Sequence, residues 1–381
     1  VAAQLLNTIL SFVCRTIFIN KLGADYLGIS GLFTNILQVF SLAELGIGNA
    51  IIILLYKPLA DRDISRLKSL TTVYARVYKI IGLAVAVLGI LLLPFLNYII
   101  KEPPNVQHLN IIYLLFVFNS SISYFFSYKR AIITADQKEY ICTTNSNVFL
   151  ILQYIIQILV LYINSDYLLF LIISIVCSLA SNIAISRKAN TLYPFLREKS
   201  SLALDSSDKR NIVKNVLAMM SHKVGSVVTN STSNILISAF VGVYWVGLYS
   251  NYQMIISIVH GFVIKIFASA SASIGNLAAT EGAKKVLEVF NVILFVGYWV
   301  YGFCAISFYI LVNPFIKLWI GEEYLLSTII VLTIVANYYL IGICSIPTSF
   351  VDATNLFWNT RYKPWAQAII NLVISMFLLD K

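Results

Sequence analysis

Residues 167–185 read YLLFLIISIVCSLASNIAI, a run of nineteen residues without a charged side chain. A helix needs roughly 20 mainly apolar residues to cross the ~30 Å hydrocarbon core of a bilayer, because lipid cannot satisfy backbone polar groups. Ten other stretches qualify or nearly do. The sequence therefore predicts an all-α polytopic membrane protein with about eleven spans, the others being residues 2–19, 27–56, 73–100, 109–128, 141–163, 212–241, 246–272, 286–312, 324–346 and the short 365–379.

The composition of the chain agrees with this fold class. Hydrophobic residues make up 59% of its 381 residues and charged residues only 12%, whereas soluble domains carry about 25% charged residues. A net charge of +10 would suggest nucleic acid, but twenty of the basic residues fall in alternate connections between spans, and only Lys21, Lys101 and Lys317 in the others. By the positive-inside rule the basic connections are cytoplasmic, which predicts a cytoplasmic N-terminus and no nucleic-acid partner.

A polar stretch at residues 187–211 separates six spans from five and indicates an internal repeat. At an offset of 219 residues, 22–28 lies over 241–247, each forming the outer turn between the first two helices of a half. Six is an even number, so both halves insert with the same orientation. The prediction is two parallel-related six-helix bundles facing a central cavity, residues 1–186 and 212–381, joined by the cytoplasmic linker 187–211. The counterpart of 167–185 falls beyond Lys381, so the second bundle is expected to be incomplete, with five spans.

Four charged residues lie inside the predicted spans: Arg15, Glu44, Lys223 and Lys265. Each costs about 2.5 to 3.5 kcal/mol at mid-membrane, so such residues usually face a cavity or a partner. Other polar residues lie on the same helix faces as these four charges. A pseudo-twofold axis would bring these faces together around a central cavity, where the four charges sum to +2. A basic cavity suits a phosphate or pyrophosphate. The predicted substrate-binding residues are Arg15, Lys223, Lys265, Asn7, Asn230, Asn234 and Gln38.

Packing is the alternative interpretation of these polar residues. Stripes of Ser, Asn and Gly hold membrane helices together without any substrate, and a basic residue such as Lys265 can extend to the interface. Glu44 is either an ion-coupling residue or the partner of a nearby base. His222 and His260 flank these positions and are interpreted as structural.

The prolines and cysteines are interpreted as structural residues. Pro58, Pro314 and Pro347 are each expected to follow a span, and Pro94 to kink the third hydrophobic stretch or mark its outer end. The five cysteines show no metal-ligand spacing. No metal or cofactor is therefore predicted.

Several runs resemble a known family, among them RTIFINKLGADYLG at 15–28, SLAELGIGNA at 41–50 followed by LYKP at 55–58, and SHKVGS at 221–226. They are similar to the lipid-linked oligosaccharide flippases, which are the O-antigen and capsular polysaccharide repeat-unit translocases of the multidrug/oligosaccharidyl-lipid/polysaccharide exporter superfamily. The likeness covers nearly the whole chain, although relatives usually have twelve or more spans.

The resemblance implies translocation of an undecaprenyl-pyrophosphate-linked oligosaccharide across the bacterial cytoplasmic membrane by alternating access, for lipopolysaccharide O-antigen or capsule biosynthesis. It also implies a cationic lumen for the headgroup, at Arg15 and Lys223 with Lys265 as a third candidate. A polysaccharide polymerase and glycosyltransferases of the same pathway would be partners. The sequence has no G-x-x-x-x-G-K-[ST] phosphate loop, so energy is expected from an ion gradient, the membrane potential or consumption of the product.

Two other functions stay open. One is an ion-coupled drug or small-molecule exporter of the same architecture, but a net positive lumen would repel a cationic cargo. The other is a membrane glycan polymerase, ligase or acyltransferase. Such enzymes typically need a catalytic constellation at one membrane face, whereas the outer connections are short and hold no H-E-x-x-H motif, acidic pair or Cys/His nucleophile arrangement. A transporter, not an enzyme, is therefore predicted.

Overall fold

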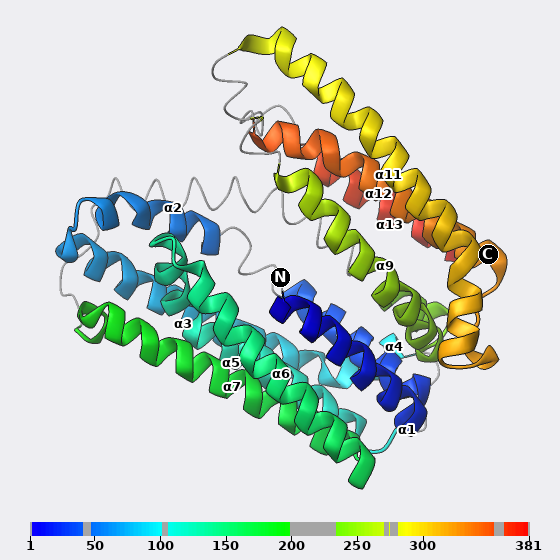
Figure 1. The fold of residues 1–381 in the computed structure, drawn as a ribbon. Coiled ribbons are helices and arrows are strands. Elements are labelled where there is room, and N and C mark those ends of the chain that lie inside the picture. Colours follow the sequence, from blue (N-terminus) through cyan, green and yellow to red (C-terminus); the bar gives the residue numbers. More distant parts are fainter. Residues whose placement is uncertain are drawn as a thin grey trace. The chain divides into compact units, whose positions relative to one another are not determined.

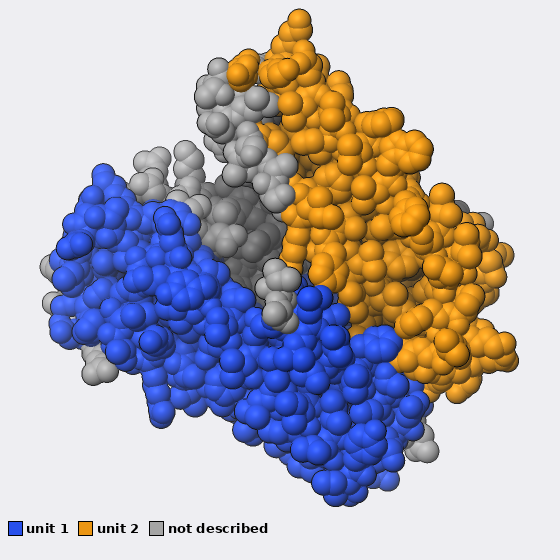
Figure 2. Space-filling model, viewed as in Figure 1, with its two compact units in different colours: residues 1–246, 364–381 blue, residues 247–363 orange. Residues whose placement is uncertain are grey.

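The computed structural model describes residues 2–40, 47–100, 106–198, 234–269, 274, 281–353 and 362–379. Every regular element in these ranges is a helix, and seven of the helices are long and apolar enough to cross a membrane. The predicted fold class, an all-α protein with many membrane-spanning helices, is confirmed. The chain forms two compact units, one of residues 1–246 with 364–381 and one of residues 247–363 (Figure 2). The division at the linker 187–211 stays a prediction.

The first unit is a bundle of long helices in which neighbours in sequence are often neighbours in space (Figure 1). α5 packs on α3 and α7, α6 packs on α7, and α1 packs on α6. The bounds are α1 (Ala2–Phe40), α2 (Ile47–Ala60), α3 (Ile64–Leu92), α4 (Leu96–Ile99), α5 (Leu109–Ala135), α6 (Glu139–Ile163) and α7 (Tyr167–Leu192).

Acidic caps decide where two of these helices begin. The Asp166 carboxylate accepts hydrogen bonds from the backbone N–H of Leu168 at 2.8 Å and of Leu169 at 3.4 Å, so α7 begins at Tyr167. The Asp63 carboxylate likewise accepts a hydrogen bond from the backbone N–H of Arg66 at 2.9 Å, so α3 begins at Ile64. Such caps satisfy donors that the first turn of a helix leaves free. The apolar run that begins at Tyr167 therefore starts as a helix at its first residue.

A kink at a glycine divides α1 into two helical segments. Gly23 has φ 84° and ψ −178°, a conformation that glycine alone adopts readily. Gly242, with φ 132°, makes the corresponding break between the helical residues 234–240 and α9 (Val243–Ser269). Gly23 and Gly242 are 219 residues apart, and so are Leu109 and Thr328, the first residues of α5 and α12 (Thr328–Ala353). Helix boundaries thus recur at the interval at which the sequence repeats.

The second unit consists of residues 247–269 of α9, α11 (Gly282–Trp319), the short turn η4 (Glu322–Tyr324) and α12. The fully buried Tyr252 of α9 joins these elements. Its hydroxyl donates to Asn313 Oδ1 at 2.6 Å and accepts from the backbone N–H of Leu326 at 2.9 Å. Asn313 Nδ2 in turn donates to the Leu326 carbonyl at 3.2 Å. The last described helix of the chain is α13 (Lys363–Leu379).

Three of the proline predictions are wrong. Pro58 lies inside α2, Pro314 inside α11 and Pro347 inside α12. A proline removes one backbone donor, and membrane helices tolerate the loss because their surroundings re-satisfy the freed carbonyl. The prediction for Pro94 is confirmed, since α3 ends at the turn η2 (Leu93–Phe95) that contains it.

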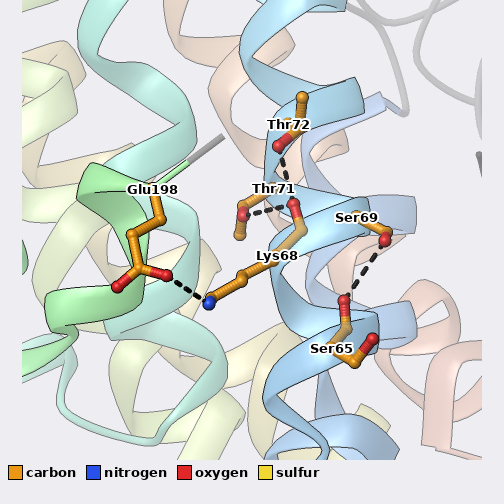
Figure 3. Close-up of polar contacts among 6 residues, drawn as sticks. All are labelled: Ser65, Lys68, Ser69, Thr71, Thr72 and Glu198. Carbon is orange, nitrogen blue, oxygen red and sulfur yellow. Dashed lines mark hydrogen bonds and ion pairs between the residues drawn. The ribbon is translucent and has the colours of Figure 1, made fainter. Parts of the chain in front are cut away.

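Polar contacts tie the chain beyond α7 to the first unit. The turn η3 (Pro194–Arg197) follows α7, and Glu198 Oε2 then lies 2.5 Å from Lys68 Nζ of α3 (Figure 3). The hydroxyls of Thr71 and Thr72 donate to the Lys68 carbonyl at 3.2 and 2.7 Å. The segment up to residue 198 therefore belongs structurally to the first bundle.

A second polar contact joins Tyr193, which follows α7, to the turn between α5 and α6. The Tyr193 hydroxyl donates to Asp136 Oδ2 at 2.6 Å, and Lys138 Nζ lies 2.6 Å from the same oxygen. Burial alone would raise the pKa of the Asp136 carboxyl. The hydrogen bonds from Lys138 and Tyr193, together with the Lys138 charge, outweigh burial and lower this pKa below its ordinary value of 3.8.

This depressed pKa predicts how the stability of the bundle varies with pH. A carboxylate whose pKa falls on folding stabilises the folded state above its ordinary pKa of 3.8 and loses that effect as the pH falls through the folded-state value. Tyr193→Phe should therefore lower the unfolding free energy by about 1 kcal/mol at pH 7 and by less below pH 3.8. Thermal unfolding in nanodiscs measures this, with the exposed Tyr98→Phe as a control. An equal loss at both pH values would contradict the assignment.

Candidate functional site

The structure describes five of the eight predicted site residues. Asn7, Arg15 and Gln38 lie on α1, Asn234 lies in the helical residues 234–240, and Lys265 lies on α9. The other three, Glu44, Lys223 and Asn230, fall outside the described residues. Gln38 and Lys265 are exposed, whereas Asn7, Arg15 and Asn234 are half-buried. The central cavity that would bring all eight together stays a prediction.

Asn7 contacts a neighbouring helix. Its side-chain amide donates to Asn147 Oδ1 of α6 at 2.8 Å, while its own Oδ1 is buried without a hydrogen bond among the described residues. The first contact favours the packing interpretation of Asn7, and the second leaves an acceptor that a substrate hydroxyl could use. Asn234 Oδ1 is likewise buried without a hydrogen bond among the described residues.

Arg15 follows a residue that anchors α1. Cys14 is buried, with its Sγ 4.0 Å from Gln157 Oε1 of α6. One turn further on, the ring of Phe18 packs edge-on against Phe170 of α7, with centroids 5.0 Å apart. Successive helical residues are 100° apart around the axis, so Arg15 projects beside this anchored face. Contacts on both sides of Arg15 in the sequence therefore hold α1 against α6 and α7.

Hydrogen-bonded polar side chains form a seam between α6 and α7 that was not predicted from the sequence. Its members are Asn145, Gln153, Gln157, Ser174 and Ser181. Gln157 is only 1% exposed, and its amide donates to Ser174 Oγ at 2.7 Å and to the Phe170 carbonyl at 3.0 Å. Gln153 donates to the Gln157 oxygen at 3.4 Å, and Asn145 donates to Ser181 Oγ at 2.8 Å. The four-residue spacing of Gln153 and Gln157, which puts both on one helix face, was the available signal.

This seam predicts a measurable loss of stability. Gln157→Leu keeps the side-chain volume but removes the two hydrogen bonds that its amide donates and the longer ones that its oxygen accepts. Each hydrogen bond between membrane helices contributes on the order of 0.6 to 2 kcal/mol. We expect the unfolding free energy to fall by about 1 to 2 kcal/mol. Gln367→Leu is the matched control, since Gln367 is exposed on α13, and it should change the unfolding free energy little. Unfolding in mixed micelles tests this, and equal effects of the two variants would count against the seam.

The second unit holds an apolar cavity of about 310 Å³ between α9 and α11. Ile255 and Val259 of α9 line it, together with Phe303, Cys304 and Phe308 of α11. None of the residues that line it carries a charge. The cavity is therefore unsuited to a pyrophosphate headgroup.

Residues 1–272 match the family model described as polysaccharide biosynthesis protein. The match covers well over half of the chain. The protein belongs to the polysaccharide biosynthesis protein family. The matched region of this family member includes the whole first bundle up to residue 246, with Arg15, and α9 with Lys265, whereas α11, α12 and α13 follow it.

Solved structures with a similar fold are membrane transporters. An inward-facing multidrug resistance MATE family transporter of the MOP superfamily aligns with 98% of this chain and 84% of its own, at a TM-score of 0.66 and 11% identity. A MATE protein in the bent conformation gives a TM-score of 0.48, with 10% identity and 99% and 93% of the two chains covered. An outward-facing MATE transporter gives 0.47, with 10% identity and 99% and 95% covered. The first likeness shows that this member of the family has a MATE-like fold. No curated protein matches the chain.

The described residues of this family member include no group of three or more His, Cys, Asp and Glu side chains placed to hold a metal ion. The polar groups described above are amides, hydroxyls and cations, which bind by hydrogen bonding and charge.

Proposed function

We propose that this protein is a flippase that moves an oligosaccharide linked to undecaprenyl pyrophosphate from the cytoplasmic to the outer leaflet of the bacterial inner membrane. The observation that carries the proposal is a match to a polysaccharide biosynthesis family in a chain with a transporter fold. A transporter in such a pathway needs a cargo that is both made on one side of the membrane and used on the other. A lipid-linked repeat unit for O-antigen or capsule meets this requirement, with glycosyltransferases before the flippase and a polymerase after it.

The charges of the spans fit a pyrophosphate headgroup. Arg15, Lys223 and Lys265 would supply cations, and a guanidinium can bind two phosphate oxygens at once. Arg15 is half-buried on an anchored helix, which makes it the strongest of the three. Asn7, Gln38, Asn230 and Asn234 would contact sugar hydroxyls. The isoprenoid tail would stay in lipid while one half rocks against the other.

The orientation follows from the basic connections. Their bias predicts a cytoplasmic N-terminus and places the loading side at the basic face. Glu44 is the ion-coupling candidate of the first half. A proton or sodium gradient, the membrane potential or removal of product by a polymerase would drive the cycle.

An ion-coupled drug exporter is the second candidate, because the solved structure with a TM-score of 0.66 is a multidrug transporter. At 11% identity that likeness extends to the fold and not to the cargo. Cationic drugs would meet an excess of positive charge in the predicted cavity, which disfavours them. A glycan polymerase or transferase is the weakest candidate, since the solved structure with a TM-score of 0.66 is a transporter and the outer connections offer no catalytic motif.

A binding measurement separates these functions. Purified protein in nanodiscs should gain thermal stability from undecaprenyl pyrophosphate, because a ligand that binds only the folded state shifts its unfolding. A cationic dye such as ethidium should give no shift. Stabilisation by the dye alone would favour the exporter. Mass spectrometry of a lipid-linked oligosaccharide after incubation would reveal a covalent change only if the protein were an enzyme.

A further inference from the structure

A histidine lies among aromatic rings inside the second unit. The imidazole of His260, on α9, has its centroid 6.1 Å from the ring of Tyr301 on α11 and 5.8 Å from the ring of Tyr338 on α12. The two tyrosine rings are themselves 5.8 Å apart in an edge-to-face arrangement. Three helices thus each contribute one ring to a single cluster, which we call the His260 cluster.

The His260 cluster is buried and its hydrogen bonding is incomplete. Tyr301 and Tyr338 are 0% and 4% exposed. His260 Nδ1 is buried without a hydrogen bond among the described residues, the Tyr338 hydroxyl interacts with Cys304, and the hydroxyls of Tyr301 and Ser345 are 3.4 Å apart. Buried polar atoms are nearly always paired, so the unpaired nitrogen of His260 inside this cluster requires an explanation.

Gly342 on α12 makes room for this arrangement. A Cβ at this position would lie 2.2 Å from Cδ1 of Tyr301, so the aromatic ring fills the space of a side chain. At the 219-residue offset, the first half of the chain has Ser41, Gly82 and Asn119 in place of His260, Tyr301 and Tyr338. Packing needs common to both halves therefore do not explain the cluster.

We propose that His260 is a proton-binding site that couples transport to a proton gradient; the coupling rests on the proposed flippase function, whereas the proton binding does not. A neutral imidazole has one N–H and one bare nitrogen, and a protonated imidazole donates from both. A hydroxyl such as that of Tyr338, whose ring centroid lies 5.8 Å from the imidazole, is an acceptor for such a donor. Both tyrosine rings lie near the 6 Å range in which an aromatic face stabilises a cation.

The surroundings decide how the proton is held. The titratable groups whose rings contact His260 are Tyr301 from α11 and Tyr338 from α12. Cys304 of α11 interacts with Tyr338, and the helix of His260 also carries the exposed Lys265. None of these groups is an anion at neutral pH. The added charge is therefore held by ring faces and a hydroxyl, and its release needs no ion pair to break.

The first test is nitrogen NMR of ring-labelled histidine in nanodiscs between pH 5 and 8. The chain has only three histidines, so variants assign the signals. We expect one titrating signal to vanish in His260→Gln and to remain in His108→Gln, whose histidine is exposed. Tyr338→Phe removes only the hydroxyl and should shift the same signal. A His260 signal that stays in one protonation state in the wild type across this range would overturn the site.

The second test is transport in proteoliposomes of undecaprenyl pyrophosphate bearing a fluorescent oligosaccharide. One pH unit across the membrane biases the cargo distribution about tenfold for each coupled proton. Wild type and His108→Gln should show this bias, and His260→Gln should lose it. A bias that survives in His260→Gln but disappears in Glu44→Gln would overturn the coupling role. Transport that fails in the wild type would overturn the proposed function, and the NMR result would then decide the proton site alone.

Discussion

Replacing Arg15 with alanine is expected to lower translocation of a lipid-linked oligosaccharide by about 10- to 100-fold. The figure follows from losing one charge-assisted hydrogen-bond set to a phosphate, about 1.5 to 3 kcal/mol, where 1.4 kcal/mol is tenfold. The amount of protein in the membrane should stay close to that of the wild type, because alanine removes a charge that is costly to insert into a span. Activity should therefore fall without a matching loss of protein, which a purely structural role of Arg15 would not produce.

Complementation of a flippase-null strain measures the activity, and immunoblots of membranes measure the amount of protein. Lys21→Ala is the matched control, since Lys21 is an exposed cation on the same helix. Arg15→Lys keeps the charge but loses the forked geometry, and should fall between the wild type and Arg15→Ala. Full complementation by Arg15→Ala would contradict the proposal that Arg15 binds the pyrophosphate headgroup.

Replacing Gly28 with alanine is expected to have the second largest effect. A Cβ on Gly28 would lie 2.1 Å from the backbone carbonyl oxygen of Val243, and neither the α1 backbone nor the start of α9 can rotate out of the way as a side chain could. Overpacking of this kind costs about 1 to 3 kcal/mol or more. We expect Gly28→Ala to reduce the folded protein in membranes severalfold.

Gly31 provides the matched control three residues later. A Cβ there would lie 3.4 Å from Cγ1 of Val246, which is ordinary contact with a movable methyl group. Gly31→Ala should therefore be nearly neutral. Fluorescence size-exclusion chromatography of the two variants measures the folded fraction. A well-folded Gly28→Ala variant would show that α1 and the start of α9 do not approach as closely as the structure has them.

Hydrophobic runs predicted the helices well because lipid imposes a simple requirement on them. The run 167–185 begins where α7 begins, and 109–128 begins where α5 begins. Both helices extend past the apolar run, to Leu192 and Ala135, because helical hydrogen bonding continues after the side chains become polar. Apolarity marks the membrane, and the helix ends are set by caps and turns.

Contacts between helices could not be predicted in the same way. The seam at Gln157 and the cluster at His260 depend on which face of each helix meets its neighbour, and a single sequence with apolar residues on all faces does not define that face. His260 is interpreted as structural from sequence because a lone histidine carries no pattern. Only the fold brings Tyr301 and Tyr338, 41 and 78 residues later, onto the same ring.

Some of the predicted substrate-binding residues could be selected from the sequence, and others could not. Arg15 could be selected from sequence because an arginine in a span is rare and costly. Asn7 could not be assigned to cavity or to packing, and its amide contacts Asn147 of α6. Amides are common in both settings, so residue type alone does not separate them.

The most direct test of the central claim is translocation itself, measured with purified protein in proteoliposomes. Undecaprenyl pyrophosphate bearing a fluorescent oligosaccharide is placed in both leaflets, and an impermeant quencher reports the fraction that is exposed. We expect protein-containing vesicles to expose the inner-leaflet substrate within minutes, and vesicles with Arg15→Ala to do so about 10- to 100-fold more slowly. Identical rates in protein-free vesicles and in vesicles with the wild-type protein would contradict the flippase function.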